Sequence, residues 1–141
     1  MEEIKWKYGS QLSDETISAV ESRLTVFFPS DYRRLVARHN GGRPKPNAIE
    51  IPGKREAVME RLLRLDAEGG DSVQGATAIL QSRGYENLVP FASDPFGNLF
   101  CFRFVGADGD FVVYWEHESG EVTTIAKSLS DFLEHLQHPR N

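Results

Sequence analysis

The amino-acid sequence predicts an α+β fold, in which helices pack against a mainly antiparallel β-meander of about four to six strands. The first reason is that residues 88–126 form short runs rich in Phe, Val, Tyr, Trp and Thr, separated by turns that contain Gly or Pro. The second is that the flanking segments carry apolar residues at the spacing of amphipathic helices. Because 141 residues suffice for one core, we expect a single domain over residues 1–141, with its core at about residues 12–136.

Two short helices are predicted near the N-terminus. Ser13 can cap the first helix, and the residue before Pro29 avoids helical conformation, which ends the pattern. The first helix has one apolar stripe, formed by Ile17, Val20 and Leu24. A second helix begins at Ser30 and stops at residues 40–42, Asn-Gly-Gly, because glycine tolerates the left-handed conformation that ends many helices. We expect these two helices to form a hairpin.

The middle of the chain is predicted to be mixed. Residues Arg43–Pro46 should be extended, because two prolines favour a polyproline-like connector. Asn47–Ile51 alternates enough for a short strand, and Lys54–Leu65 has apolar residues at helical spacing. We therefore expect a helix over Lys54–Leu65, a polar loop over Ala67–Gly75 and a short helix over Ala76–Arg83.

The predicted sheet lies in the last third of the chain. Its strands are Leu88–Ala92, Leu99–Val105, Phe111–Glu116 and Glu121–Ala126. The connections are short, so neighbouring strands should be antiparallel and form a meander. A final helix is predicted after Ser128, which can cap it.

Alternation along the strands predicts two apolar faces. Phe100, Phe102 and Phe104 fall on one face, and Cys101 and Arg103 fall on the other. We expect helices to cover one face and the other to be at least half covered, with Cys101 as a small buried side chain. Arg103 and Trp115 are interpreted as exposed contacts, because Trp and Arg dominate binding hot spots.

The charge of −5 is unevenly distributed along the chain. Residues 1–85 carry 13 Lys and Arg against 12 Asp and Glu, whereas residues 86–141 carry 3 against 9. Such an acidic field repels nucleic acid and attracts basic partners, although a set of solvated loops is the alternative interpretation. Adding the acids of residues 106–121 to the two exposed contacts gives the candidate partner-binding residues: Arg103, Asp108, Asp110, Trp115, Glu116, Glu118 and Glu121. A second, basic set at residues 33–45 is interpreted as a solvated helix face.

Other chemistry is not indicated by the residues. The sequence has no Gly-rich phosphate-binding motif, and no Ser or Cys stands out as a nucleophile with a base and an orienting group. His39 is interpreted as a core histidine, and the remaining histidines lack the ligand spacing of a metal site. We therefore expect neither a catalytic site nor a metal or other cofactor.

The sequence also gives an expected location. No apolar run approaches the ~20 residues that cross a bilayer, and the N-terminus has no apolar signal region. A single cysteine fits a reducing compartment. We expect a cytoplasmic protein that binds another protein and neither membrane nor nucleic acid.

Several short motifs occur in a familiar order. Residues 28–35 read Phe-Pro-Ser-Asp-Tyr-Arg-Arg-Leu and residues 40–44 read Asn-Gly-Gly-Arg-Pro. Residues 88–98 read Leu-Val-Pro-Phe-Ala-Ser-Asp-Pro-Phe-Gly-Asn, followed by Val-Val-Tyr-Trp-Glu-His-Glu at 112–118 and Ser-Leu-Ser-Asp-Phe-Leu at 128–133. From about Leu12 to Leu136 the chain resembles the SUKH superfamily, in the branch of the yeast cell-wall-assembly regulators Smi and Knr. Residues Lys54–Leu65 do not match the family pattern, and Phe28 stands where a leucine is usual.

This resemblance implies both a fold and a class of function. The implied fold is a SUKH-like α+β domain with helices against a mainly antiparallel sheet. Bacterial proteins of this kind are commonly immunity proteins, which bind and block a cognate polymorphic or contact-dependent toxin, often a nuclease, and share no catalytic site. A regulatory scaffold with a non-toxin partner is the alternative, and a small metal-binding or enzymatic domain is a third.

Overall fold

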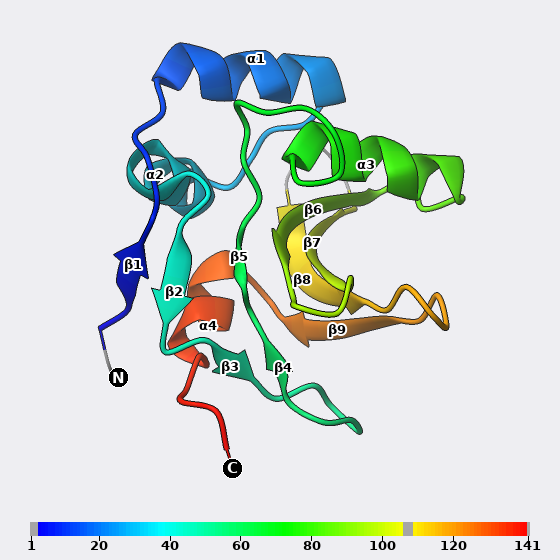
Figure 1. Ribbon diagram of the computed structural model, residues 1–141. Coiled ribbons are helices and arrows are strands. Elements are labelled where there is room, and N and C mark those ends of the chain that lie inside the picture. Colours follow the sequence, from blue (N-terminus) through cyan, green and yellow to red (C-terminus); the bar gives the residue numbers. More distant parts are fainter. Residues whose placement is uncertain (1–2, 106–108, 141) are drawn as a thin grey trace.

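The computed structural model of the protein describes residues 3–105 and 109–140 (Figure 1). The described helices are α1 (Asp14–Leu24), α2 (Ser30–His39), α3 (Val73–Ser82) and α4 (Leu129–Glu134). The described strands are β1 (Lys5–Lys7), β2 (Arg43–Lys45), β3 (Ala48–Ile49), β4 (Ala57–Val58), β5 (Arg61–Leu62), β6 (Leu88–Ser93), β7 (Leu99–Phe104), β8 (Gly109–Trp115) and β9 (Val122–Ala126). Helices packed on antiparallel strands confirm the predicted α+β class.

The main sheet contains five strands in the order β5-β6-β7-β8-β9, and every neighbouring pair is antiparallel. Strands β6 to β9 follow one another along the chain, which confirms the predicted meander. Two small sheets, β1–β2 and β3–β4, complete the described strands (Figure 1). Of the predicted loop at residues 106–110, residues 106–108 lie outside the described part, and the backbone of residues 109–110 already belongs to β8.

The helix predicted over Lys54–Leu65 is wrong. This segment is extended and contains β4 and β5. The N–H groups of Leu62 and Leu63 donate to the carbonyls of Gly42 and Phe91, both at 2.9 Å. Strand β6 and Gly42 therefore offer the segment hydrogen bonds that no local pattern reveals, and helix propensity is too weak to resist them.

The other helices lie close to where the sequence placed them. The Ser13 hydroxyl caps α1 as predicted, accepting a hydrogen bond from the Thr16 N–H at 3.2 Å. Helix α3 begins inside the predicted loop, because the Ser72 hydroxyl accepts from the Gly75 N–H at 3.0 Å and so starts the helix earlier. Residues 43–45 are extended as predicted and pair with β1.

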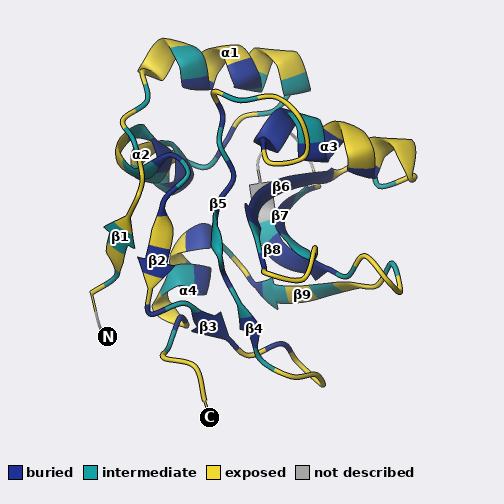
Figure 2. Cartoon of the chain, in the orientation of Figure 1, coloured by how far each residue is buried: buried dark blue, intermediate teal, exposed yellow. Residues whose placement is uncertain are grey.

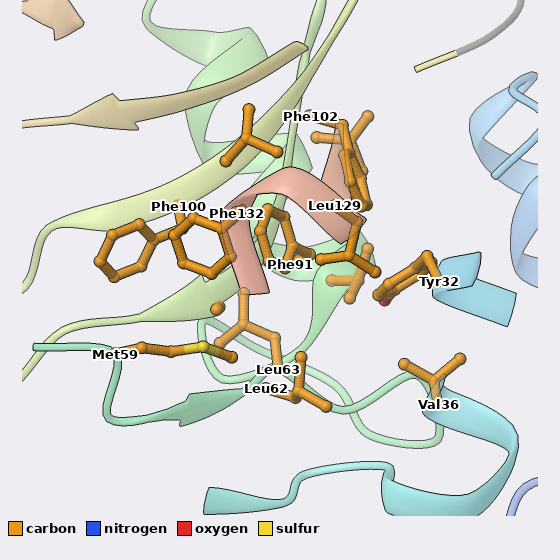
Figure 3. Packing of buried hydrophobic residues seen from close by; sticks show 14 of the residues in the cluster. Tyr32, Val36, Met59, Leu62, Leu63, Phe91, Phe100, Phe102, Leu129 and Phe132 are labelled. Atoms are coloured by element: carbon orange, nitrogen blue, oxygen red, sulfur yellow. The ribbon is translucent and has the colours of Figure 1, made fainter. Parts of the chain in front are cut away.

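One face of the main sheet carries the principal core, which is aromatic (Figure 3). The rings of Phe91 and Phe102 stack with their centroids 4.4 Å apart. Tyr32 of α2 meets Phe102 edge-on at 5.1 Å, and Phe132 of α4 lies 5.3 Å from Phe100. Helices α2 and α4 therefore cover this face, and Figure 2 shows the buried strands β6 and β8 together with the exposed residues along α1.

The opposite face of the sheet is covered by α3. Here a second, smaller cluster is formed by Leu80, Leu88, Cys101, Val113 and Trp115. The sulfhydryl of Cys101 is fully buried, which confirms the predicted small buried side chain. Burial raises the pKa of this thiol, because the thiolate would lose its hydration.

Candidate functional site

Two turns lie together at one end of the main sheet. In an antiparallel meander, alternate connections fall at the same end, so the β6–β7 turn at residues 94–98 neighbours the β8–β9 turn at residues 116–121. A hydrogen bond joins them, because the His117 N–H donates to the Asn98 Oδ1 at 3.0 Å. We call the surface formed by these two turns the turn rim.

Asp94 holds the first turn in place. Its Oδ1 accepts hydrogen bonds from the N–H groups of Phe96 and Asn98, both at 2.8 Å. Its Oδ2 accepts from the Asn98 Nδ2 at 2.9 Å and from the Tyr114 hydroxyl at 2.7 Å. Burial and the Asp94 carboxylate raise the pKa of Tyr114, which keeps its hydroxyl the donor. The Asp-Pro-Phe-Gly-Asn motif is therefore a structural device.

Gly97 completes this turn for steric reasons. Its φ is +90°, a conformation that a residue with a Cβ rarely adopts. An added Cβ would also lie 3.3 Å from the His117 ring, so this exposed side chain would have to shift slightly.

Phe96 at the apex of the first turn is an exposed aromatic residue. Its side chain is 76% exposed, which is unusual for a ring of this size. A hollow of about 430 Å³ separates it from the second turn and is lined by Phe96, Asn98, Glu116, His117, Glu118 and Ser119. The exposed ring beside this hollow offers apolar area that a partner can remove from water.

The acids of the second turn differ in their pairing. The Lys54 Nζ lies 2.9 Å from the Glu116 Oε2 and also pairs with Glu121. This ammonium lowers the pKa of Glu121, and both carboxylates raise the pKa of Lys54. Glu118 is exposed and forms no ion pair within residues 3–105 and 109–140. The rim is therefore acidic, but less so than the sequence suggested.

Trp115 and Arg103 do not lie at the turn rim. The prediction that Trp115 is an exposed contact is wrong, because α3 covers its indole and only 4% of the residue is accessible. Arg103 is half-buried on the same face of the sheet, where its guanidinium lies 5.3 Å from the centre of the Phe111 ring and donates to the Thr124 hydroxyl at 3.2 Å.

Two of the predicted contact residues are not tested by the coordinates. Asp108 lies outside the described residues, and Asp110 stands at the start of β8 with a side chain that the structure does not describe. The structure thus brings together Glu116, Glu118 and Glu121 from the predicted set.

Two residues of this surface, Phe96 and Lys54, were not among the contacts predicted from the sequence. Phe96 had a signal, because a large aromatic residue between Pro95 and Gly97 at the apex of a turn has few ways to be buried. Lys54 had none, because it is 67 residues away from Glu121 in the chain.

The basic residues of α2 are only partly solvated. Arg33 forms ion pairs with Asp14 and Glu21, so it links α1 to α2. Arg34 is exposed and has no ion pair in the described part of the chain. His39 is half-buried and stacks on Trp6 with the ring centres 5.6 Å apart, and burial followed by the charge of Arg38 lowers its pKa.

Within residues 3–105 and 109–140, no group of three His, Cys, Asp or Glu side chains could hold a metal ion. No helix in that part of the chain is long and apolar enough to cross a membrane.

The architecture and the known families give the same class of protein. A five-stranded antiparallel sheet covered by helices, with a structural Asp-Pro-Phe-Gly-Asn turn between β6 and β7, makes this a small α+β domain. The family SUKH_6, described as SMI1-KNR4 cell-wall, matches residues 14–133. The chain therefore belongs to this family. A search of curated proteins finds no match.

Proposed function

We propose that this chain is a non-catalytic, cytoplasmic protein-binding domain, and specifically an immunity protein that binds and occludes a toxin with a basic surface. Membership of the SUKH_6 family supports this class of function. The observation that carries the proposal is the turn rim, where the exposed ring of Phe96 lies beside Glu118 and the Glu116–Lys54–Glu121 group.

Each part of the rim has a separate role in this proposal. Phe96 supplies apolar contact area that is lost from water on binding, and such aromatic anchors dominate binding energy. The acids steer a basic partner during diffusion and raise the association rate, an effect that salt weakens. Bound at this surface, the domain blocks the toxin sterically.

The proposal is tested in two stages. The tagged full-length chain is used to purify its partner from the native strain, and the kinetics of binding to that purified protein are then measured. We expect Phe96→Ala to weaken affinity by roughly tenfold or more, mainly through faster dissociation. Glu118→Lys should slow association, and the difference from wild type should shrink as salt is added.

Arg34→Glu is the matched control, because Arg34 is exposed, unpaired among the described residues and part of α2, outside the rim. Equal losses at Arg34, Phe96 and Glu118, or no loss at any of them, would refute the rim as the binding surface. A purified partner that is no toxin would refute the immunity role.

A regulatory scaffold is the second candidate, favoured by the cell-wall description of the family. In that case the purified partner is a component of the cell's own machinery, and the gene next to that of this chain encodes no toxin. The same variants still map the contact surface.

A further inference from the structure

A groove lies between α3 and the sheet face opposite the aromatic core. Its volume is about 370 Å³. The floor follows a row of residues that pair from strand to strand: Arg61 with Ser93, Ser93 with Leu99, and Leu99 with Trp115. The wall is one side of α3, because Ala76, Ile79, Leu80 and Arg83 recur at helical spacing. The groove therefore has a mixed lining, in which apolar side chains of α3 and the sheet stand beside charged and polar residues.

Two hydrogen-bond donors at this groove have no acceptor in the described structure. The Trp115 Nε1 is buried, and none of the described residues accepts from it. Arg83 is exposed and forms no ion pair within the described residues, and its guanidinium lies 5.7 Å from the centre of the Trp115 ring. A buried donor without an acceptor is unfavourable, so a local rearrangement that brings an acceptor to the Trp115 Nε1 is stabilising.

Most of the other charged groups of the groove already have ion-pair or hydrogen-bond partners. Arg61 pairs with Asp71 at 3.0 Å, next to the beginning of α3. The oxygens of Asp94 accept the hydrogen bonds that hold the β6–β7 turn. Glu60 precedes Arg61 in the chain and adds a negative charge near that pair. The unpaired positive charge is therefore at the other end of α3, at Arg83.

We propose that this groove docks a segment of the protein partner that carries an apolar side chain next to a carboxylate. The apolar side chain packs against Ile79, Leu80 and Leu99. The carboxylate pairs with Arg83, which leaves the indole, and the Trp115 Nε1 gains an acceptor when the side chains around it shift. Arg83 selects a carboxylate at its own end of the groove, because it is an exposed cation without an ion pair in the described part of the chain, whereas Glu60 and Asp71 lie near Arg61.

The groove is continuous with the turn rim. Asn98 and His117 line both the groove and the hollow beside Phe96. A partner seated on the rim can therefore extend a segment into the groove. The inference rests on the proposed function only in that the occupant is part of a protein partner.

The test follows the indole N–H signal of Trp115 in the nitrogen-15-labelled full chain. Trp6→Phe assigns it, because the chain contains 2 Trp. The probes are the peptides acetyl-Ala-Leu-Leu-Asp-amide and acetyl-Ala-Leu-Leu-Asn-amide, which differ in one negative charge. We expect the acidic peptide to move the Trp115 signal in a saturable way, and the Asn peptide to bind about fivefold more weakly.

Arg83→Gln should remove the preference for the acidic peptide. Arg103→Gln is the matched control, because Arg103 also lies over an aromatic ring on this face, yet it is not among the groove residues. An unchanged Trp6 signal shows that each variant is folded.

Several results would overturn the inference: a Trp115 signal that neither peptide moves, equal binding of the two peptides, or an acidic preference that survives Arg83→Gln. An equal effect of acetate alone would identify a small-carboxylate site and would also overturn it. The peptide-binding experiment needs no toxin, so a negative result in it would not affect the proposal that the turn rim binds the partner. Conversely, if the rim variants Phe96→Ala and Glu118→Lys bound the partner normally, the proposal for the turn rim would be refuted, and the proposal for the groove would be unaffected.

Discussion

The two faces of the main sheet are built from alternate residues of the same strands, yet they differ in how completely they are closed. On the aromatic face, rings from α2, α4 and the strands pack against one another, and Tyr32, Phe91 and Phe132 are fully buried (Figure 3). On the α3 face, the cluster around Cys101 is closed, but the region of Leu99 stays open beside Trp115. One face therefore stabilises the fold, and the other leaves surface for recognition.

The largest expected effect is a loss of stability that differs between the two faces of the sheet. Phe91→Ala should lower the free energy of unfolding by about 3–5 kcal/mol, because it leaves a cavity in a packed aromatic cluster. Leu99→Ala should cost less than about 2 kcal/mol, because Leu99 is only half-buried at the open groove. Urea unfolding of both variants measures this difference. Equal losses would mean that the α3 face is as closed as the aromatic face.

A smaller effect sharpens the comparison within the aromatic face, between its interior and its edge. The Tyr32 hydroxyl is buried with no hydrogen-bond partner in the described structure, so Tyr32→Phe should raise the free energy of unfolding by about 1 kcal/mol. Tyr114→Phe should lower it by about 1–2 kcal/mol, because the Tyr114 hydroxyl donates to Asp94. Thermal unfolding of the two variants shows whether each change in the free energy of unfolding is positive or negative. A loss of stability in Tyr32→Phe would contradict the packing described for the interior.

The smallest expected effect concerns the turn rim. Lys54 lowers the pKa of Glu121 in the folded chain, so their ion pair contributes stability above the ordinary Glu pKa. That contribution is lost as the pH falls through the lowered pKa. Lys54→Met should therefore be slightly less stable than wild type near neutral pH, and the difference should vanish in acid. The effect is small because these side chains are exposed and solvent screens them.

Urea unfolding at a series of pH values checks this prediction. Lys45→Met is the control, because Lys45 is exposed and forms no ion pair among the described residues. A carbon-detected titration of Glu121 in Lys54→Met should place its pKa higher than in wild type. A difference between Lys54→Met and wild type that persists in acid would mean that Lys54 acts through packing.

Much of the fold was predictable because its determinants are local. The caps at Ser13 and Ser128, the stop after α2 and the alternation of strands β6 to β9 all depend on residues a few positions apart. These features arise from backbone geometry and short hydrogen bonds, which a sequence pattern records directly.

The site was less predictable because its determinants are far apart in the chain. The spacing of the apolar residues in segment 54–65 indicates a helix, but pairing with β6 makes this segment extended. Trp115 stands near a strand end, yet α3 folds over it, and Lys54 crosses to Glu116 and Glu121 from a distant loop. The sequence by itself determined the class of fold and the acidic character of its last third. Only the tertiary structure decided which charges are paired, which aromatic ring is exposed and where a groove stays open, because each depends on contacts between segments that are brought together only when the chain folds.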